Sequence, residues 1–526
     1  MGLGTILIRA DASATMGAGH LMRCLALAQE WKHSGGEAIF AVAQSLPALE
    51  ARLVAEGWRV ARIEAAAGAI TDANSAIEIA RRYSAGWIVL DGYHFDCAYQ
   101  SKIKKSGLKL LLLDDLGGAG RFAADLIVNQ NAHADEQMYA NREAYTRALL
   151  GPRFALLRRE FRTQAAHARR AESKRVLITM GGSDPENASG KILEAVRSIP
   201  VESLEVAVIV GPGSRAPLVG DRSQNGCAVQ IVRNPPSLIE YMQWADVAVS
   251  AAGTTVLEMC RAGLPMVLLS VAENQVRGTI ELARRGVVKY LGPVHEVSQC
   301  ELSDAVRALL CSKEARDRMS LLGQELVDGN GARRVVGAML SANLQLRRAT
   351  FQDCDLLWEW ANEAGVRAAS FHSEAISRDE HRGWFASKLR AENARIYVAE
   401  DQSGSAVGQF RVEWRTTDEA AVHVSIAAEK RGLGIGGELI RRAMEMASRE
   451  TATRRFHAYI KPENKASLRA FEKAGFTRVE SQPGAIHCCF EVPHAEVENE
   501  ASVNLREWLG SSDPLCDYPD LLRGTS

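Results

Sequence analysis

One histidine stands where a glycine-rich turn runs into a helix-like segment. The turn Gly17-Ala18-Gly19-His20 is followed by apolar residues at helical spacing. A dinucleotide-binding turn would need glycine in place of Met22, and a P-loop would need lysine in place of His20. Gly17 and Gly19 would let the backbone approach a ligand. Because the positive end of a helix disfavours imidazolium, we expect a neutral His20 that takes a proton from water as a general base. The alternative is a first-turn histidine satisfied by an ordinary hydrogen bond.

Two turns in the middle of the chain have the form of phosphate-binding loops. Gly181-Gly182-Ser183 follows an apolar run and precedes a helix-like segment, and Gly253-Thr254-Thr255 repeats this arrangement. Backbone amides at such helix starts bind phosphate groups. Glu258 lies one turn into the second helix, where a carboxylate suits the vicinal hydroxyls of a ribose; a solvated helix residue is the alternative. Asn274 and Gln275 offer further polar groups from the next loop.

Alternating strands and helices must position these residues. The predicted strands of the first 340 residues are short apolar runs, and two of them end in aspartate, those over 87–91 and 109–114. The runs are Thr5–Ala10, Ala38–Ala43, Trp87–Asp91, Lys109–Asp114, Leu126–Asn129, Arg175–Met180, Leu204–Val210, Val247–Ser250 and Pro265–Leu269. Such alternation indicates parallel sheets with helices on both faces. We expect an α/β fold with two doubly wound halves, residues 1–165 and 170–340, and a ligand in the crevice between them.

The pattern changes after about residue 346. Successive strands are expected at Ile396–Glu400, Val407–Trp414 and Ala420–Ile426, followed by a glycine-rich turn and a helix over Gly437–Ser448. This predicts an α+β domain over residues 346–492. Residues 493–526 form a tail that is either disordered or docked through Trp508 and Leu509.

Composition favours a cytoplasmic enzyme. The chain has 526 residues, and its 63 basic and 64 acidic side chains give a formal net charge of −1, which supports neither a nucleic-acid nor a membrane partner. Ten cysteines include no CxxC pair, and the N-terminus has no signal-peptide pattern. No Asp-x-Asp pair occurs in the first 340 residues, so we expect no metal. The oligomeric state stays open.

The motifs of the first 340 residues resemble one enzyme family. The stretches GAGHLMRC, MGGSDPEN and SAAGTTVLE, with a following ENQ, are similar to those of the UDP-sugar hydrolase of pseudaminic acid biosynthesis, which has a GT-B architecture similar to the MurG glycosyltransferase. The resemblance implies that UDP binds mainly to the second half, that the sugar faces the first, and that His20 activates the attacking water. It also implies sugar-site roles for Asp91 and Tyr93.

The third domain resembles the GNAT-type N-acetyltransferases. Arg431-Gly432-Leu-Gly434-Ile-Gly436 is similar to their Arg/Gln-x-x-Gly-x-Gly/Ala loop, whose amides can hold the pyrophosphate of coenzyme A. Asn464 and Ser467 belong to a second matching segment, which ends in Glu-Lys-Ala-Gly-Phe. The resemblance implies acetyl-CoA as co-substrate.

One position departs from the GNAT pattern. Phe471 stands where many relatives have a tyrosine that protonates the leaving thiolate. Tyr459, His487 or water would have to replace it, and Glu413 and His423 are candidate general bases, although a structural role is the expected alternative for each.

Together the two resemblances imply consecutive steps on one UDP-sugar: acetylation of the 4-amino group, then hydrolysis to free sugar and UDP. Two other interpretations remain. The first 340 residues could transfer the sugar to an acceptor, as a glycosyltransferase does, or the chain could be a nucleotide-sugar sensor that keeps the GNAT fold as a scaffold. A related diamino sugar is also compatible with the motifs.

Overall fold

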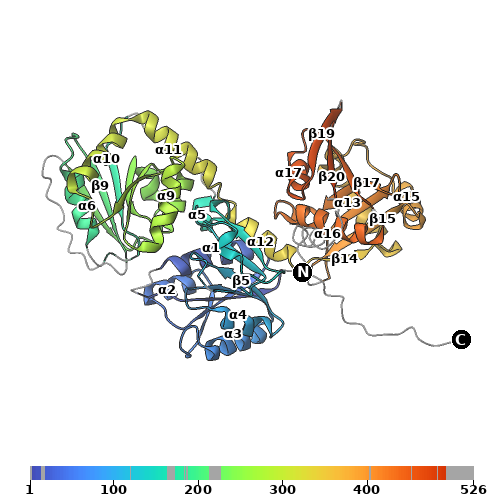
Figure 1. Cartoon of the computed structure of the whole chain (residues 1–526), viewed down its shortest axis with the longest axis horizontal. Helices are drawn as coiled ribbons and strands as arrows, with labels where there is room; N and C mark the ends of the chain where they lie inside the picture. The colour runs from blue at the N-terminus through green and yellow to red at the C-terminus, as the bar shows by residue number, and fades with distance from the viewer. Residues whose placement is uncertain are drawn as a thin grey trace. The chain divides into compact units, whose positions relative to one another are not determined.

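The computed structural model describes residues 3–13, 18–118, 120–162, 172–182, 184, 187–211, 227–401, 404–451, 453–482 and 484–492. The chain divides into two compact units, residues 2–336 and a unit that begins at 337 (Figure 1). The predicted site residues Gly17 and Ser183 and the predicted tail over 493–526 lie outside the described residues.

The first half is built on a seven-stranded parallel sheet. Its strand order is β3-β2-β1-β4-β5-β6-β7. The strands are β1 (Thr5–Ala10), β2 (Glu37–Val42), β3 (Arg59–Arg62), β4 (Ala85–Asp91), β5 (Lys109–Leu113), β6 (Leu126–Asn129) and β7 (Arg147–Leu150). The five predicted runs became β1, β2, β4, β5 and β6, because nearly continuous apolar side chains are buried on both faces of a parallel sheet.

Helices cover both faces of this sheet. They are α1 (Gly19–His33), α2 (Pro47–Ala55), α3 (Ile70–Arg82), α4 (Cys97–Lys104) and α5 (Arg159–Arg162), with 3-10 turns η1 (Gln137–Tyr139) and η2 (Pro152–Phe154). Apolar residues of α3 and α4 pack with one face of β1, β4 and β5, and α1 covers the opposite face (Figure 1). Because α1 follows β1 directly, its first turn lies at the carboxyl edge of the sheet.

The second half repeats the design with six parallel strands in the order β10-β9-β8-β11-β12-β13. The strands are β8 (Arg175–Thr179), β9 (Glu205–Val210), β10 (Ala228–Arg233), β11 (Val247–Ala251), β12 (Met266–Ser270) and β13 (Lys289–Pro293). The helices are α6 (Ala188–Arg197), α7 (Ile239–Trp244), α8 (Thr255–Ala262), η3 (Glu273–Gln275), α9 (Val276–Arg284), α10 (Gln299–Cys311), α11 (Lys313–Leu326) and α12 (Gly331–Ser341). Helices α7, α8 and α9 bury one face of the sheet, and α6 and α10 bury the other.

The unit that begins at 337 has a mixed, mainly antiparallel sheet in the order β14-β15-β16-β17-β18-β20-β19. The strands are β14 (Gln345–Arg348), β15 (Ala394–Glu400), β16 (Ala406–Trp414), β17 (Glu419–Ile426), β18 (Arg455–Ile460), β19 (Thr477–Gln482) and β20 (Ala485–Glu491). The helices are η4 (Phe351–Asp353), α13 (Cys354–Asn362), α14 (Ala364–Ala369), α15 (Arg378–Arg390), η5 (Ala428–Lys430), α16 (Ile435–Glu450) and α17 (Lys465–Lys473). The predicted meander and long helix are therefore confirmed as β15, β16, β17 and α16.

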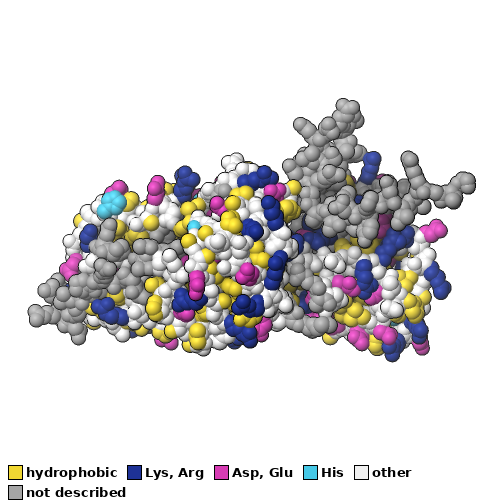
Figure 2. Space-filling model, turned by 90° about the horizontal axis from the view of Figure 1, so that it is seen from below, with side chains coloured by type: hydrophobic (Ala, Val, Ile, Leu, Met, Phe, Trp, Pro, Cys, Tyr) yellow, Lys and Arg dark blue, Asp and Glu magenta, His cyan; other side chains and the backbone are white. Residues whose placement is uncertain are grey.

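Three of the strands that the sequence did not reveal lie at sheet edges. Strands β3, β10 and β13 are partly or largely exposed along their length, so they lack the buried apolar run that identifies a central strand. Acidic and basic side chains are interspersed over the described residues of the face in Figure 2, in keeping with the near-zero net charge.

Candidate functional site

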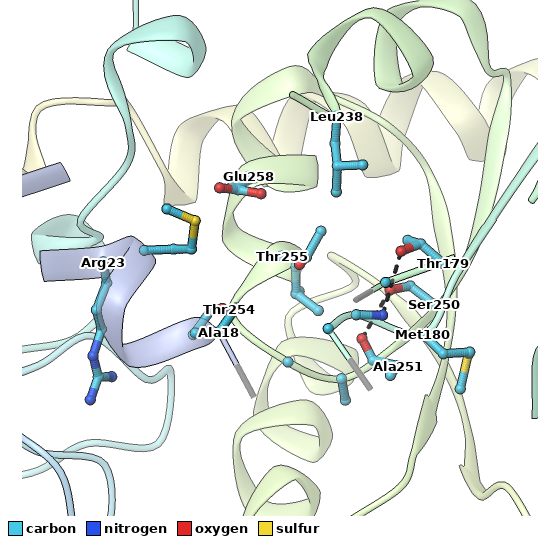
Figure 3. Close-up of a pocket in the computed structure, with 18 of the residues that line it drawn as sticks. Ala18, Arg23, Thr179, Met180, Leu238, Ser250, Ala251, Thr254, Thr255 and Glu258 are labelled. Atoms are coloured by element: carbon cyan, nitrogen blue, oxygen red, sulfur yellow. Dashed lines mark hydrogen bonds between the residues drawn. The ribbon is translucent and has the colours of Figure 1, made fainter. Parts of the chain in front are cut away.

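A cavity of about 1380 Å³ opens between the two halves of residues 2–336, where the strands of both sheets end. Figure 3 shows part of its lining. The predicted site residues that line it are Gly19, His20, Tyr93, Gly181, Gly182, Gly253, Thr254, Thr255, Glu258, Asn274 and Gln275. The motifs thus converge on one cavity, although they are spread over more than 250 positions of the chain.

His20 is held by the carboxylate of Asp91, which lies behind it and does not line the cavity. The Nδ1 atom of His20 is 2.6 Å from Oδ1 of Asp91, and both side chains are buried. Burial alone would raise the pKa of Asp91, but the charge of Arg23 and the contact with His20 hold this pKa at about 2. An ionised carboxylate can only accept a hydrogen bond, so Nδ1 of His20 carries the proton. In a neutral imidazole the lone pair then lies on Nε2, which suits a general base.

Arg23 and Asp115 complete the buried polar group, and the sequence analysis missed both. Arg23 lies one turn beyond His20 on α1 and donates to both oxygens of Asp91, at 2.6 Å each. It also donates to Oδ1 of Asp115 at 2.8 Å. Asp115 follows β5, the strand beside β4, which carries Asp91. The sequence signal that could have indicated this site was the pair of apolar runs that end in aspartate. Adjacent parallel strands end at the same edge of a sheet, so polar residues that follow them lie close together.

Tyr93 connects the two halves beside His20. Its ring meets the His20 ring edge-on, with centroids 4.9 Å apart. Its hydroxyl donates toward Oδ2 of Asp115 at 3.4 Å and accepts from the side-chain amide of Asn274, in the second half, at 3.3 Å. Desolvation and the charge of Asp115 raise the pKa of Tyr93 to about 12, so the hydroxyl keeps its proton.

The glycine turns also bring the halves close together. A Cβ atom at Gly19 would lie 3.4 Å from Oγ1 of Thr254, and one at Gly182 would lie 3.4 Å from the backbone nitrogen of Ala18. Thr254 and Ala18 lie side by side in Figure 3. A Cβ at Gly211 would come within 2.3 Å of the Gly181 carbonyl oxygen, so that position requires glycine. A Cβ at Gly19 or Gly182 would therefore make only an ordinary van der Waals contact with the other half.

Glu258 reaches the cavity from the first turn of α8 (Figure 3). Arg158 of the first half donates to Oε1 of Glu258 from Nε at 3.3 Å and from a terminal nitrogen at 3.1 Å. Burial raises the pKa of Glu258, and the Arg158 charge opposes the rise. Gln275 accepts from the backbone of Val271 at 3.0 Å and so fixes its own loop. A ribose at Glu258 would share that carboxylate with Arg158.

The loop over 431–436 in the other unit has a backbone that requires glycine. Gly432 and Gly434 have φ angles of +75° and +83°, and Gly434 directly precedes α16. Such angles strain residues that have a Cβ atom. Arg431 donates to the Ile426 carbonyl oxygen at 2.9 Å and forms an ion pair with Glu363. The loop therefore presents the start of a 16-residue helix, which favours an anionic group.

Strands β17 and β18 diverge beside this loop. They pair in parallel over three residues of each strand, Glu419–Ala421 with Arg455–His457, and then separate. Beyond β18, the Asn464 side chain accepts from the backbone of Ser467 at 3.0 Å and caps α17. Asn464 and Ser467 thus hold the start of that helix.

Two family models match parts of this chain. Residues 175–321 match the family model described as the glycosyltransferase family 28 C-terminal domain, and residues 343–477 match the acetyltransferase (GNAT) domain. The chain joins these two domain types. The predicted fold class is confirmed: a GT-B-type pair of doubly wound halves is followed by an α+β GNAT domain.

Three relatives extend the comparison. An uncharacterized protein of Methanocaldococcus jannaschii is 23% identical over 90% of this chain and 96% of its own length. The spore coat polysaccharide biosynthesis protein SpsG of Bacillus subtilis is 25% identical over 45% of this chain and 71% of its own length. The solved structure of MurG from Acinetobacter baumannii covers 63% of this chain and 97% of its own, with 16% identity and a TM-score of 0.45.

The GNAT match supports acetyl-CoA as co-substrate. Phe471 is 3% exposed and packs against Phe476, so α17 offers no hydroxyl at that position. The Tyr459 hydroxyl accepts from Arg415 at 3.0 Å, and its ring stacks on His487 at 4.8 Å.

The predicted base candidates of the GNAT domain lie on neighbouring strands. Glu413 is paired with Lys388 at 2.8 Å and Arg411 at 2.7 Å. Lost hydration and the Arg411 charge lower the pKa of His423 to about 4, which leaves its imidazole neutral at pH 7. A pKa this low also makes the imidazole a weak base, so it does not favour His423 over Glu413 as the proton acceptor.

The described residues offer neither a metal-binding cluster nor a membrane-spanning helix. They contain no group of three or more histidine, cysteine, aspartate or glutamate side chains placed to hold a metal ion. Their helices include none that is both long and apolar enough to cross a bilayer.

Proposed function

We propose that the chain is a bifunctional nucleotide-sugar enzyme whose first 336 residues hydrolyse a UDP-sugar. The observation that carries this proposal is the 2.6 Å contact between Nδ1 of His20 and Asp91 at the wall of the cavity. It leaves Nε2 of His20 as the proton acceptor for a water molecule. The water oxygen attacks the anomeric carbon, the bond from that carbon to the phosphate oxygen breaks, and His20 takes the proton.

The second half would bind the leaving group. The start of α8 and the Gly181-Gly182 turn line the cavity, and backbone amides at such positions stabilise the negative charge that grows on a departing diphosphate. Glu258 would accept hydrogen bonds from the ribose hydroxyls. The match to glycosyltransferase family 28 supports a nucleotide-sugar ligand here.

The GNAT domain would catalyse the step before hydrolysis, which is the acetylation of the sugar. The loop over 431–436, with Asn464 and Ser467, would hold acetyl-CoA, and the acetyl group would pass from sulfur to a sugar amine. We propose the 4-amino precursor of UDP-2,4-diacetamido-2,4,6-trideoxy-β-L-altropyranose as the acceptor and this product as the substrate for hydrolysis. The similarity to a polysaccharide biosynthesis protein supports sugar chemistry.

Mass spectrometry of the products tests both steps. The 4-amino UDP-sugar is incubated with the full chain, with and without acetyl-CoA. We expect acetylated free sugar and UDP when acetyl-CoA is present. His20→Ala should stop the reaction at the acetylated UDP-sugar. If neither an acetylated species nor free sugar forms, the proposal is wrong.

Glycosyl transfer is the second candidate, favoured by the family 28 match. His20 would then deprotonate a hydroxyl group of an acceptor in place of water. UDP release that requires an added acceptor would favour transfer, whereas release of free sugar without one would exclude it. Nucleotide-sugar binding without turnover, with an affinity that His20→Ala lowers, would favour a sensor.

A further inference from the structure

Helix α12 contains a glycine at a position where alanine would form a better helix. Gly337 is buried in the second half of α12, shortly before the GNAT match, which begins at residue 343. Glycine inside a helix is destabilising relative to alanine. Its presence there indicates that another part of the protein approaches the helix too closely for a side chain.

The group that approaches Gly337 is the peptide bond between Leu433 and Gly434, in the loop over 431–436. A Cβ atom at Gly337 would lie 1.4 Å from the Leu433 carbonyl oxygen, 2.6 Å from the carbonyl carbon and 3.5 Å from the Gly434 nitrogen. All three are backbone atoms, so no side-chain rotation can make room. By contrast, a Cβ at Gly383, inside α15 of the same unit, would meet nothing within 4 Å. Position 337 therefore requires glycine for this approach.

The three distances also give the direction of this peptide bond. They increase from oxygen to carbon to nitrogen, so the Leu433 carbonyl oxygen points at α12. In a trans peptide the N–H points opposite to the C=O, and none of the described peptide bonds is cis. The Gly434 N–H therefore points away from α12. Gly434 is the N-cap of α16, and the first amides of a helix, which have no partner inside it, are donors for an anion.

A side chain at position 337 would displace the loop more readily than the helix. Residues 337–341 of α12 are all buried, so this part of the helix has no space into which it could retreat. The segment after α12 is also tied to α16, because Arg442 donates to the Leu344 carbonyl oxygen at 2.7 Å. Leu433, in contrast, lies between two glycines, whose backbone can change conformation most easily. Its carbonyl is therefore the group that would turn away.

We propose that Gly337 is a positioning residue for the coenzyme. By letting the Leu433 carbonyl oxygen point at α12, it directs the Gly434 N–H toward the pyrophosphate of acetyl-CoA. Gly337 acts only through this peptide bond and does not itself contact the coenzyme. The inference rests on the proposed coenzyme role of the loop over 431–436. It extends the coenzyme site to a helix residue that precedes the GNAT match.

Calorimetric binding of two ligands to the full chain tests this proposal. Acetyl-CoA carries the pyrophosphate, and S-acetylpantetheine carries the same thioester arm without it. A hydrogen bond to a charged acceptor is worth about tenfold in affinity or more, so Gly337→Ala should weaken acetyl-CoA binding by about that factor. The affinity for S-acetylpantetheine, which cannot form this bond, should not change. Gly383→Ala, where the added Cβ meets open space, should bind both ligands as the wild type does.

The other outcomes overturn the proposal. Unchanged acetyl-CoA affinity in Gly337→Ala would exclude a positioning role, and equal loss for both ligands would show a merely structural one. Amide hydrogen exchange of the wild-type chain gives a measurement that does not depend on how the variant folds. Acetyl-CoA should slow exchange of the Gly434 amide, and unchanged exchange would contradict the inferred hydrogen bond. A wild-type chain that binds no acetyl-CoA would instead show that the proposed coenzyme function has failed.

Discussion

His20 and Asp91 are 71 positions apart in the chain, yet Nδ1 of His20 lies 2.6 Å from Oδ1 of Asp91. Arg23 donates to both oxygens of the same carboxylate. Asp91 therefore sets the tautomer of the imidazole, and Arg23 keeps Asp91 ionised. The proposed general base depends on both neighbours.

Asp91→Asn should lower the rate of hydrolysis by about 10²–10⁴-fold, which is the range for losing a positioned general base. An asparagine can donate to Nδ1, which would move the imidazole proton to Nε2 and remove the lone pair from the cavity. Single-turnover release of free sugar measures the effect, and UDP affinity serves as the folding control. A variant that keeps the wild-type rate would exclude the role of Asp91.

Asp91 should also make stability depend on acid pH. Its folded pKa, about 2, is below the ordinary value of 3.8, so ionised Asp91 stabilises the fold above about pH 4. That contribution is lost as the pH falls from 4 toward 2, and it amounts to about 2 kcal/mol.

Calorimetric unfolding of the wild-type chain and Asp91→Asn between pH 6 and pH 2 checks this expectation. The unfolding transition that shifts with added UDP marks the first unit. The difference in stability between the two chains should shrink on acidification. A difference that is independent of pH would contradict the assignment.

Glu258→Gln should weaken UDP binding by about tenfold, since a hydrogen bond to a charged acceptor is worth roughly 1.5–3 kcal/mol. The amide would accept less strongly from ribose hydroxyls and would leave Arg158 without its charge partner. Titration calorimetry with UDP measures the change, and Glu314→Gln on α11 is the matched control. Unchanged affinity would place the ribose elsewhere.

Gly434→Ala should impair acetyl-CoA binding without affecting UDP affinity. A Cβ at Gly434 would meet nothing within 4 Å, so the effect is conformational: φ is +83°, where alanine costs about 1–2 kcal/mol. Gly404→Ala is a matched control, because Gly404 has φ +76° and equally open space in the same unit. Equal loss in both variants would mean general destabilisation, which would contradict a specific role of the loop.

Much of the fold could be predicted from sequence because its signals are local. Buried strands such as β1 and β4 are continuous apolar runs, and glycines mark turns whose backbone needs them. The edge strands β10 and β13 lack that signal. Asn464 shows another limit: the sequence placed it in a coenzyme site, and the structure adds that its side chain caps α17.

The sequence by itself predicted which loops carry chemistry: the turn at His20, the two glycine turns of the second half and the loop over 431–436. Only the tertiary structure decided which residues meet. Strand β4 lies between β1 and β5 in the first sheet, and this order brings Asp91 and Asp115 to His20 and Arg23. Packing of the halves then brings Arg158 to Glu258. Apolar periodicity is written into a few neighbouring residues, whereas strand order and domain packing depend on side chains from the whole chain.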